Sequence, residues 1–556
     1  PSSRYGHTPV SEGRREDTGI RSAARIILPR RGRQGGAGYP PFFIWLPAVC
    51  AAAGLLLPPA YLTLRTVGAG SEAWDLLFRV RVLEILGQSL LLVGAVTAAS
   101  VALAVPLAWL TVRTDLPLRK AWAVLTVLPL VIPSYVAGFV VVVALGPRGM
   151  LQKLLDGPFG VDRVPDIFGF PGAFLTLAFL TYPYVLLTVR AALLRLDPAL
   201  EEVSRSLGHS SWRTFLRVVL PQLRPALAAG ALLVALYTLS DFGAVSLLQY
   251  ETFTWAIFVQ YDSALDRTLG AALSLVLMAL ALGMLAIEAT TRGRSRYYRS
   301  GPGPARPPSL VHLGRGRWPA LAFCAAVLSA SLLLPISTLS YWVARSVAAG
   351  EPFSVLWEAT RNSLYVSALT AGAAVAAALP IVVLSVRYSS LFSALLERTT
   401  YIGFALPGIA VALALVFFSV NYALPLYQTT GLLVFAYVVL FISAAVGAAR
   451  SSLLLVSPRI EEAGRSLGRS PARVFVSVTL PMVWPGIVSG AALVFLLTMK
   501  ELPATLILSP IGFTTLATSV WAAASEAFFA RAATPALLLV VVSSLPLALL
   551  LSRERR

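Results

Sequence analysis

Charged side chains are scarce in this sequence. Asp, Glu, Lys and Arg together make up 13% of the 556 residues, whereas hydrophobic residues make up 57%. A soluble globular protein of this length is excluded, because too few charged groups remain to cover a water-exposed surface. Apolar stretches of about 20 residues recur along the chain, and each is long enough to cross a hydrocarbon core of about 30 Å. The sequence therefore predicts a protein that crosses the lipid bilayer many times.

Cysteine, histidine and lysine are also rare. Cys50 and Cys324 both lie in apolar stretches, which excludes a disulfide framework or a cysteine metal cluster. His7, His209 and His312 fall in a predicted tail, loop and linker, so a membrane enzyme lacks its catalytic groups. None of the three lysines follows a glycine, so the phosphate-binding loop G-x-x-x-x-G-K-[ST] cannot form. We therefore predict a chain that is not an enzyme and that hydrolyses no ATP itself.

Arginine accounts for most of the net charge of +19, and its distribution is uneven. It is concentrated before the first apolar stretch, between residues 291 and 317, and at the C-terminus. Arginine beside membrane spans on the cytoplasmic side follows the positive-inside rule, so we assign this charge to topology and expect no nucleic acid partner. Both termini are predicted to be cytoplasmic. Residues 1–40, rich in Gly, Arg and Ser, are predicted to be disordered.

Twelve apolar stretches are predicted to be transmembrane helices. The first six are 42–64, 86–112, 121–146, 171–194, 226–248 and 268–289. The second six are 318–343, 362–387, 398–421, 430–452, 486–509 and 533–551. The predicted fold is an all-α membrane protein with two six-helix halves, 41–290 and 318–552, joined by a cytoplasmic linker, 291–317.

The two halves are sequence repeats. Ser89, Pro106, Arg113 and Pro133 each recur 274 residues later, as Ser363, Pro380, Arg387 and Pro407. In the later spans the spacing is 260 residues, because the first half has a longer loop between its third and fourth spans. An even number of spans gives both halves the same orientation, unlike the inverted repeats of many secondary transporters. A pathway between two equivalent halves is therefore expected.

The strongest match between the halves lies in a loop, at 197–225 and 457–485. The first copy contains EEVSRSLGHS and the second EEAGRSLGRS, and both continue through Leu-Pro into the next span. Asp197-Pro198 and Ser457-Pro458 each provide a side-chain cap followed by proline at the first helical position. Gly208 and Gly468 can end the short helix in a left-handed conformation, and Ser210 and Ser470 can cap a second helix. Each half thus presents a short, capped and exposed helix.

These segments resemble the EAA loop of ABC importer permeases, in which a short helix docks in a groove of the ATP-hydrolysing subunit. The resemblance assigns this coupling role to Glu201, Glu202 and Gly208 in the first half, and to Glu461, Glu462, Ala463 and Gly468 in the second. Val203 stands where the motif prefers alanine. The resemblance implies the type I permease fold in a bacterial inner membrane. It also implies two separate ATP-binding cassette subunits that carry ATP and Mg, an extracytoplasmic solute-binding protein, and no cofactor on this chain.

Two carboxylates lie inside predicted spans, where a charge is costly and therefore a candidate for function. Asp241 lies in the fifth span, and Glu501 occupies the matching position 260 residues later. Hard oxygen ligands suit a hard cation such as ferric iron. The alternative is a structural role, in which Glu501 pairs with Lys500 and Asp241 bonds to a neighbouring backbone group or hydroxyl. No metal ligand set is assigned.

The stretches SDFGAVSLL, KELPATLIL and IGFTTLATSVWAAASE resemble ferric-iron importer permeases, and the resemblance covers nearly all of the chain after residue 40. We therefore expect ferric iron as the transported solute. A thiamine permease is an alternative, because Tyr182, Tyr184 and Tyr237 could contact a cationic ring. Polyamine and phosphonate permeases are further alternatives. An ion-coupled secondary transporter is an alternative of another class, and it would show inverted repeats and helices broken at the membrane midplane.

The predicted topology can be tested with reporter fusions. A reporter fused after Arg299 is expected to be cytoplasmic, and one fused near Asp162 periplasmic, because the arginine-rich linker stays inside. Alkaline phosphatase activity, which requires export, should be high only for the second fusion. The reverse pair of activities would contradict the orientation.

Overall fold

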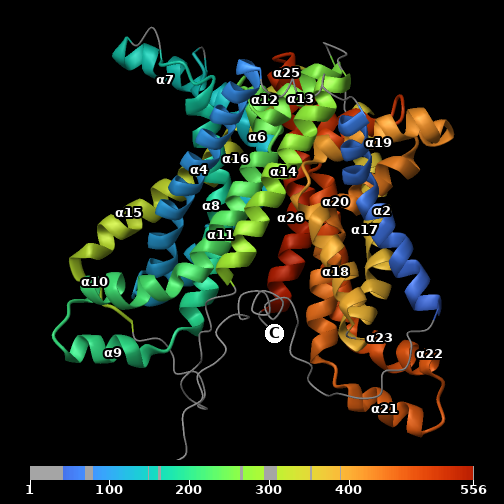
Figure 1. Cartoon of the computed structure of the whole chain (residues 1–556). Coiled ribbons are helices and arrows are strands. Elements are labelled where there is room, and N and C mark those ends of the chain that lie inside the picture. The colour runs from blue at the N-terminus through green and yellow to red at the C-terminus, as the bar shows by residue number, and fades with distance from the viewer. Residues whose placement is uncertain are drawn as a thin grey trace, which may run out of the picture. The chain divides into compact units, whose positions relative to one another are not determined.

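The computed structural model describes residues 42–68, 79–147, 149–160, 164–262, 267–292, 310–350, 354–388 and 390–554. Nearly all of these residues are helical (Figure 1), and their one β feature is an isolated bridge between Thr114 and Val311. The predicted all-α fold is confirmed. The predicted disordered segment 1–40 and residues 293–309 of the linker lie outside the described ranges.

Eleven helical segments in these ranges are long and apolar enough to cross a membrane, and one bent pair raises the number to 12. The first half contains α2 (Phe42–Gly68), α4 (Val80–Arg113), α5 (Arg119–Leu125), η1 (Leu128–Val131), α6 (Ser134–Leu145), α7 (Met150–Phe159), α8 (Phe170–Arg195), α9 (Pro198–Ser206), α10 (Ser211–Thr214), η2 (Phe215–Val219), α11 (Leu220–Ser240), α12 (Gly243–Leu247), α13 (Phe253–Asp262) and α14 (Arg267–Arg292).

The second half repeats this order. It contains η3 (Gly314–Gly316), α15 (Arg317–Leu328), η4 (Ser329–Leu333), α16 (Leu334–Ala348), α17 (Ser354–Arg387), α18 (Leu391–Ala405), α19 (Gly408–Tyr422), η5 (Leu424–Leu426), α20 (Thr430–Leu455), α21 (Pro458–Ser466), α22 (Pro471–Val474), η6 (Phe475–Thr479), α23 (Leu480–Met499), α24 (Pro503–Leu508), α25 (Leu516–Ser525) and α26 (Phe529–Glu554). The short helices α9 and α21 lie at the same end of the helices (Figure 1), as a direct repeat requires.

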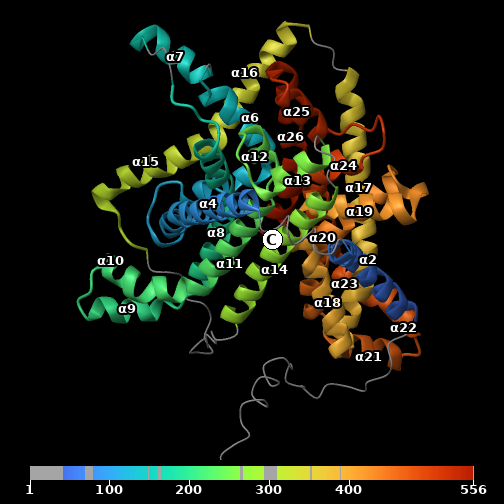
Figure 2. The same cartoon turned by 45° about the horizontal axis from the view of Figure 1, so that its top comes forward.

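The first helix of each half packs against the other half. Helix α2 contacts α17, α18 and α19, and the run α15–η4–α16 contacts α4, α8 and α6; both views show α2 beside α17 and α15 beside α4 (Figures 1 and 2). On α15, Cys324 and Val327 are buried in the core of the first half. On α2, Gly54 lies against the ring of Phe435, where a Cβ would come within 3.1 Å of the ring. The apolar surface buried by this exchange joins the two halves into one unit.

The third span of each half is broken, which corrects the continuous helices predicted at 121–146 and 398–421. Pro133 precedes α6 and Pro407 precedes α19. A proline disfavours the helical conformation of the residue before it, and Ile132 and Leu406 are indeed extended, with ψ of 124° and 128°. The segments Leu391–Gly403 and Gly408–Tyr422 consequently meet at an angle of 104°.

The fifth span of each half is also broken, which corrects the predictions 226–248 and 486–509. In the first half α11 ends at Ser240 and the short helix α12 begins at Gly243; in the second, α23 ends at Met499 and α24 begins at Pro503. Each fifth span starts with a π-helical turn, η2 or η6, followed by Leu-Pro. Proline donates no backbone hydrogen bond and its ring crowds the preceding turn, so a widened turn at this place is expected.

The end of the linker that the structure describes is tied to the first half. The backbone N–H of Val311 donates to the carbonyl oxygen of Arg113 (2.8 Å), and that of Leu313 donates to Oδ1 of Asp115 (2.9 Å). His312 Nδ1 lies 3.0 Å from the other oxygen of Asp115. The Leu313 N–H and the His312 ring together lower the pKa of Asp115 below its ordinary value. The linker therefore joins α15 to the chain directly after α4.

Candidate functional site

The loop 197–225 folds as its sequence predicts. Asp197 accepts a hydrogen bond from the N–H of Ala199 (3.0 Å) and caps α9, which begins at Pro198. The chain leaves α9 through Gly208, whose φ of +84° lies in the left-handed region that glycine adopts without strain. Ser210 then caps the next turn by accepting from the N–H of Arg213.

The loop 457–485 repeats this geometry with one difference. Gly468 has φ of +80°, and Ser470 accepts from the N–H of Arg473 (3.4 Å). The predicted side-chain cap at Ser457 is wrong. The N–H of Ile460 bonds to the backbone carbonyl of Ser457 (3.1 Å), and no cap bond to the Ser457 hydroxyl is formed. Proline at position 458 still begins α21.

A buried ion pair attaches each loop to the end of the second span of its half. In the first half, Nη2 of Arg113 lies 3.0 Å from Oε1 of Glu201, and these side chains are only 1% and 6% exposed. In the second half, Nη2 of Arg387 lies 2.9 Å from Oε1 of Glu461. The same arginines donate to the carbonyl oxygens of Leu193 (3.1 Å) and Val456 (3.0 Å), at the ends of α8 and α20. Each arginine therefore links three elements of its half.

Sequence reasoning missed this contact. It treated Glu201 and Glu461 as part of an exposed helix, whereas both are buried, at 4% and 8% exposure. The signal was present, because Arg113 and Arg387 recur at the spacing of the early spans. The other predicted coupling residues, Glu202, Glu462 and Ala463, are exposed on α9 and α21 and remain available to a partner.

The two loops differ in the second partner of the buried carboxylate. Glu201 has a second cation, Arg205, at 3.2 Å. Glu461 instead accepts a hydrogen bond from the hydroxyl of Thr479 (3.1 Å), and its matching arginine, Arg465, forms no ion pair in the described part of the chain. The halves are therefore equivalent in fold but not in side chains.

A cavity of about 200 Å³ lies between the halves and is lined by both predicted carboxylates. Asp241 and Glu501 each occupy the break of a fifth span, and the breaks of the third spans lie opposite them. The cavity wall from the first half is Pro133, Ser134, Tyr135, Tyr184, Leu233, Leu236, Tyr237, Ser240, Asp241, Phe242 and Gly243. The wall from the second half is Leu406, Gly408, Leu440, Phe441, Leu497, Lys500, Glu501, Leu502 and Pro503. The structure thus places both residues in the wall of one cavity, whereas the repeat predicted only that they lie at similar depth.

Each carboxylate also holds the backbone at its own break. Oδ1 of Asp241 accepts from the N–H groups of Ala244 (3.0 Å) and Val245 (3.4 Å), and Oε1 of Glu501 accepts from that of Ala504 (3.1 Å). These donors are at the starts of α12 and α24, where helical N–H groups lack partners. The structural alternative for Asp241, a bond to neighbouring backbone, is therefore confirmed, and it coexists with a position in the cavity wall.

The structural alternative for Glu501, an ion pair with Lys500, is wrong. Nζ of Lys500 donates to the carbonyl oxygen of Leu130 in the other half (2.8 Å), and no ion pair joins Lys500 to Glu501 among the described residues. A hydrogen bond between the two halves therefore lies beside the cavity. Within the described ranges, no group of three or more His, Cys, Asp or Glu side chains could hold a metal ion.

An aromatic cluster lies beside the cavity and joins the two halves. The Phe242 ring lies 4.9 Å from that of Phe258, 6.2 Å from Trp255 and 6.1 Å from Trp521 of the second half, measured between ring centroids. Nε1 of Trp521 also donates to the hydroxyl of Ser246 (3.4 Å). The elements that carry the cluster, α12, α13 and α25, lie at the opposite end from α9 and α21 (Figure 1).

A family model described as "Binding-protein-dependent transport system inner membrane component" matches the chain twice, over residues 88–290 and 368–553. The chain is 38% identical to the "Fe(3+)-transport system permease protein FbpB 2" of Haemophilus influenzae, over 94% of this chain and 99% of that protein. It is 24% identical to the "Ferric transport system permease protein FbpB" of Actinobacillus pleuropneumoniae, over 77% of this chain and 65% of that protein.

A shorter relative matches one half. The "Molybdenum transport system permease protein ModB" of Escherichia coli is 31% identical over 36% of this chain and 91% of its own length. A protein of this kind is about the size of a single half. The double match of the family model and this half-length relative both agree with two homologous halves in one chain.

The left-handed glycines provide a test of the loops. Changing Gly208 and Gly468 to valine should disfavour the left-handed turn by about 1–2 kcal/mol or more at each position and misdirect α9 and α21. No atom lies within 4 Å of a Cβ built at either glycine, so the effect comes from backbone strain alone. Solute uptake by cells should fall while the amount of chain in the membrane stays the same.

Asparagine is the matched control, because it tolerates the left-handed conformation better than other non-glycine residues. The variant with Gly208→Asn and Gly468→Asn should retain most of the uptake. Full uptake in the valine variant would show that the geometry of these turns is not needed.

Proposed function

Because the chain belongs to the family of binding-protein-dependent transport system inner membrane components, we propose that it forms the translocation pathway for ferric iron. Members of this family are the membrane components of ABC importers, whose ATP is hydrolysed on other subunits. This chain contributes both halves of the pathway.

The observation that carries the iron proposal is the pair of carboxylates in one central cavity. Asp241 and Glu501 come from equivalent breaks and line a cavity with one cationic side chain, Lys500. Oxygen ligands of negative charge suit Fe³⁺ and repel an oxyanion such as molybdate. The relative of similar length and 38% identity carries a ferric-iron name, which supports the same cargo.

Thiamine is a second candidate, because two of the three tyrosines considered for it do line the cavity. The rings of Tyr184 and Tyr237 lie 5.7 Å apart and could contact a cationic ring. Tyr182 does not belong to this wall; it is fully buried and its hydroxyl lies 3.5 Å from that of Ser331. Because only two of the three tyrosines line the cavity, iron is the better candidate.

The loop helices are proposed to face the cytoplasm and two ATP-binding cassette subunits, one under α9 and one under α21. The exposed residues Glu202, Glu462 and Ala463, with the turns at Gly208 and Gly468, would form the docking faces. A solute-binding protein would then approach the opposite end, which carries α12, α13 and α25. ATP and Mg would be bound by the cassette subunits.

These contacts support alternating access as the transport mechanism. Closure of the cassette subunits would draw α9 and α21 together, and the buried arginine–glutamate pairs would carry this motion into α4 and α17. The fifth spans begin directly after the loops and end at Asp241 and Glu501, so the motion reaches the cavity. The Phe242–Trp521 cluster would separate to admit iron from the binding protein.

An ion-coupled secondary transporter is disfavoured by the direct repeat and not by the shape of the helices. Broken helices, which we expected of that class, occur here in the third and fifth spans of both halves. The repeat units nevertheless run in the same direction, with α9 and α21 at one end (Figure 1).

Amide substitution separates the charge of the cavity from its structural bonds. The double variant Asp241→Asn, Glu501→Gln keeps the side-chain carbonyl oxygens that accept from Ala244 and Ala504 but removes both negative charges. Uptake of radiolabelled iron by proteoliposomes that contain the full complex should fall roughly tenfold, which corresponds to about 1.4 kcal/mol of lost attraction. The melting temperature should stay close to that of the unchanged protein.

Alanine at both positions is the comparison. It removes the helix-capping bonds as well as the charge, so it should lower the melting temperature in addition to uptake. Normal iron uptake in the amide variant would contradict the role of these carboxylates in cation passage. Loss of thiamine uptake without loss of iron uptake would favour the second candidate.

A further inference from the structure

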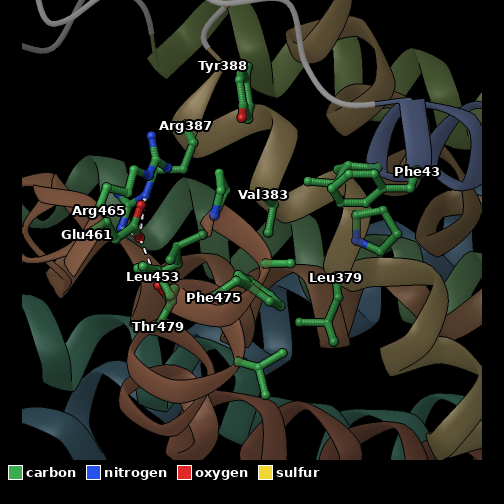
Figure 3. Close-up of a pocket in the computed structure, with 16 residues that line it drawn as sticks. Phe43, Leu379, Val383, Arg387, Tyr388, Leu453, Glu461, Arg465, Phe475 and Thr479 are labelled. Atoms are coloured by element: carbon green, nitrogen blue, oxygen red, sulfur yellow. Dashed lines mark hydrogen bonds and ion pairs between the residues drawn. The ribbon is translucent and has the colours of Figure 1, made fainter. Parts of the chain in front are cut away.

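A second cavity, of about 300 Å³, lies at the loop 457–485 and has no part in the pathway described above. It is formed where the start of α2 and the end of α17 meet α21, α22 and η6. Phe43, Leu379, Val383 and Phe475 supply apolar surface, and Arg387, Glu461 and Arg465 lie together at one side (Figure 3). An apolar cavity of this size with a few polar groups at one edge is typical of a ligand site.

One of the two arginines at the polar edge of the cavity has no acidic partner among the described residues. Arg387 is held by Glu461 and by the carbonyl oxygen of Val456, so its charge is balanced within the chain. Arg465 lines the same cavity, is exposed, and forms no ion pair among the residues that the structure describes. Its counterpart in the first half, Arg205, is paired with Glu201. The edge of the cavity therefore has a guanidinium that is free to bind an anion.

The first half carries bulkier side chains at two matching positions. Trp109 and Trp212 stand at the positions that match Val383 and Ala472, two residues of the cavity wall. The rings of both tryptophans contact Phe215, at centroid distances of 6.1 and 5.8 Å. Phe215 matches Phe475, which faces the cavity in the second half. A valine and an alanine in place of two indoles leave less side-chain volume around Phe475 than around Phe215.

The position of the cavity limits its ligand. Leu379 and Val383 lie in the last turns of a membrane span, and Phe43 lies in the first turn of another, so the apolar part of the cavity is at the depth of lipid chains. Arg387 ends the span α17, and Arg465 on the loop helix α21 lines the same cavity, so this edge is at the depth of lipid headgroups. A molecule with an apolar chain and an anionic head fits both parts.

We propose that this cavity binds one anionic phospholipid of the surrounding bilayer, with an acyl chain between Phe43, Val383 and Phe475 and its phosphate on Arg465. The site is assigned to the second half, where a valine and an alanine stand at the positions of the two indoles of the first half. The bound lipid contacts α21, α22 and η6, so it supports one of the two loops through which the ATPase subunits act. The proposal is independent of which solute is transported.

Two variants of the full chain test the site in different ways. Val383→Trp, Ala472→Trp copies the first half and adds two indoles at the cavity wall, and Arg465→Ala removes the free guanidinium but leaves the space. Each protein is purified in detergent with an equimolar mixture of phosphatidylglycerol and phosphatidylcholine, and the retained lipid is measured by native mass spectrometry. The unchanged chain should retain phosphatidylglycerol in preference to phosphatidylcholine, and both variants should lose most of this preference.

Arg459→Ala is the matched control, because Arg459 lies on the same helix but outside the cavity wall. It should retain phosphatidylglycerol as the unchanged chain does. Inorganic phosphate alone should not raise the melting temperature of the unchanged chain, whereas phosphatidylglycerol should raise it, and the tryptophan variant should no longer respond. Equal retention by the unchanged chain and the tryptophan variant, or equal retention of the two lipids by the unchanged chain, would overturn the proposal.

Discussion

The buried pairs Arg113–Glu201 and Arg387–Glu461 are the contacts on which the rest of this structure depends. Removing two charges from water is costly, and in each half the short ion pair and the arginine's bond to a backbone carbonyl offset part of that cost. In the first half Nε and Nη1 of Arg113 are buried without a hydrogen-bond partner in the described part of the chain. Loss of one partner alone would leave a buried charge and cost about 3–5 kcal/mol. The pairs join α9 to α4 and α21 to α17. Since the fifth spans start in these loops and are broken at Asp241 and Glu501, continuous helix extends from each loop to the central cavity.

The two halves share this connection but have diverged around it. In the first half, Arg205 is the second partner of Glu201, and Trp109 and Trp212 pack against Phe215. In the second half, Thr479 is the second partner of Glu461. A cavity lies beside Arg465, which forms no ion pair among the described residues. Such differences are possible in a fused chain, where each half always has the same neighbour. The halves also exchange their first helices. Helix α2 packs against the second half, and α15 packs against the first.

Much of the fold could be predicted from the sequence. Long apolar runs, the two repeat spacings and the signals at Asp197, Gly208 and Gly468 act locally, so they identified the helices, the halves and the loop turns. The breaks at Pro133 and Pro407 were missed because apolar composition alone continues through them, although the prolines were visible. The partners of Glu201 and Lys500 could not be predicted, since both depend on how distant segments pack. The repeat predicted only that Asp241 and Glu501 lie at similar depth; that both line one cavity depends on how the two halves pack together.

In this mechanism each loop helix and the second span of its half move as one body. Electron spin distances in the reconstituted complex test it most directly, with Cys50 replaced by serine and labels at two pairs of exposed positions. Ser206→Cys with Ser466→Cys reports the separation of α9 and α21, and Ser206→Cys with Ala102→Cys reports the position of α9 relative to α4. With ATP, the first distance should shorten and the second should stay unchanged. A change in the Ser206–Ala102 distance on ATP binding would contradict the account.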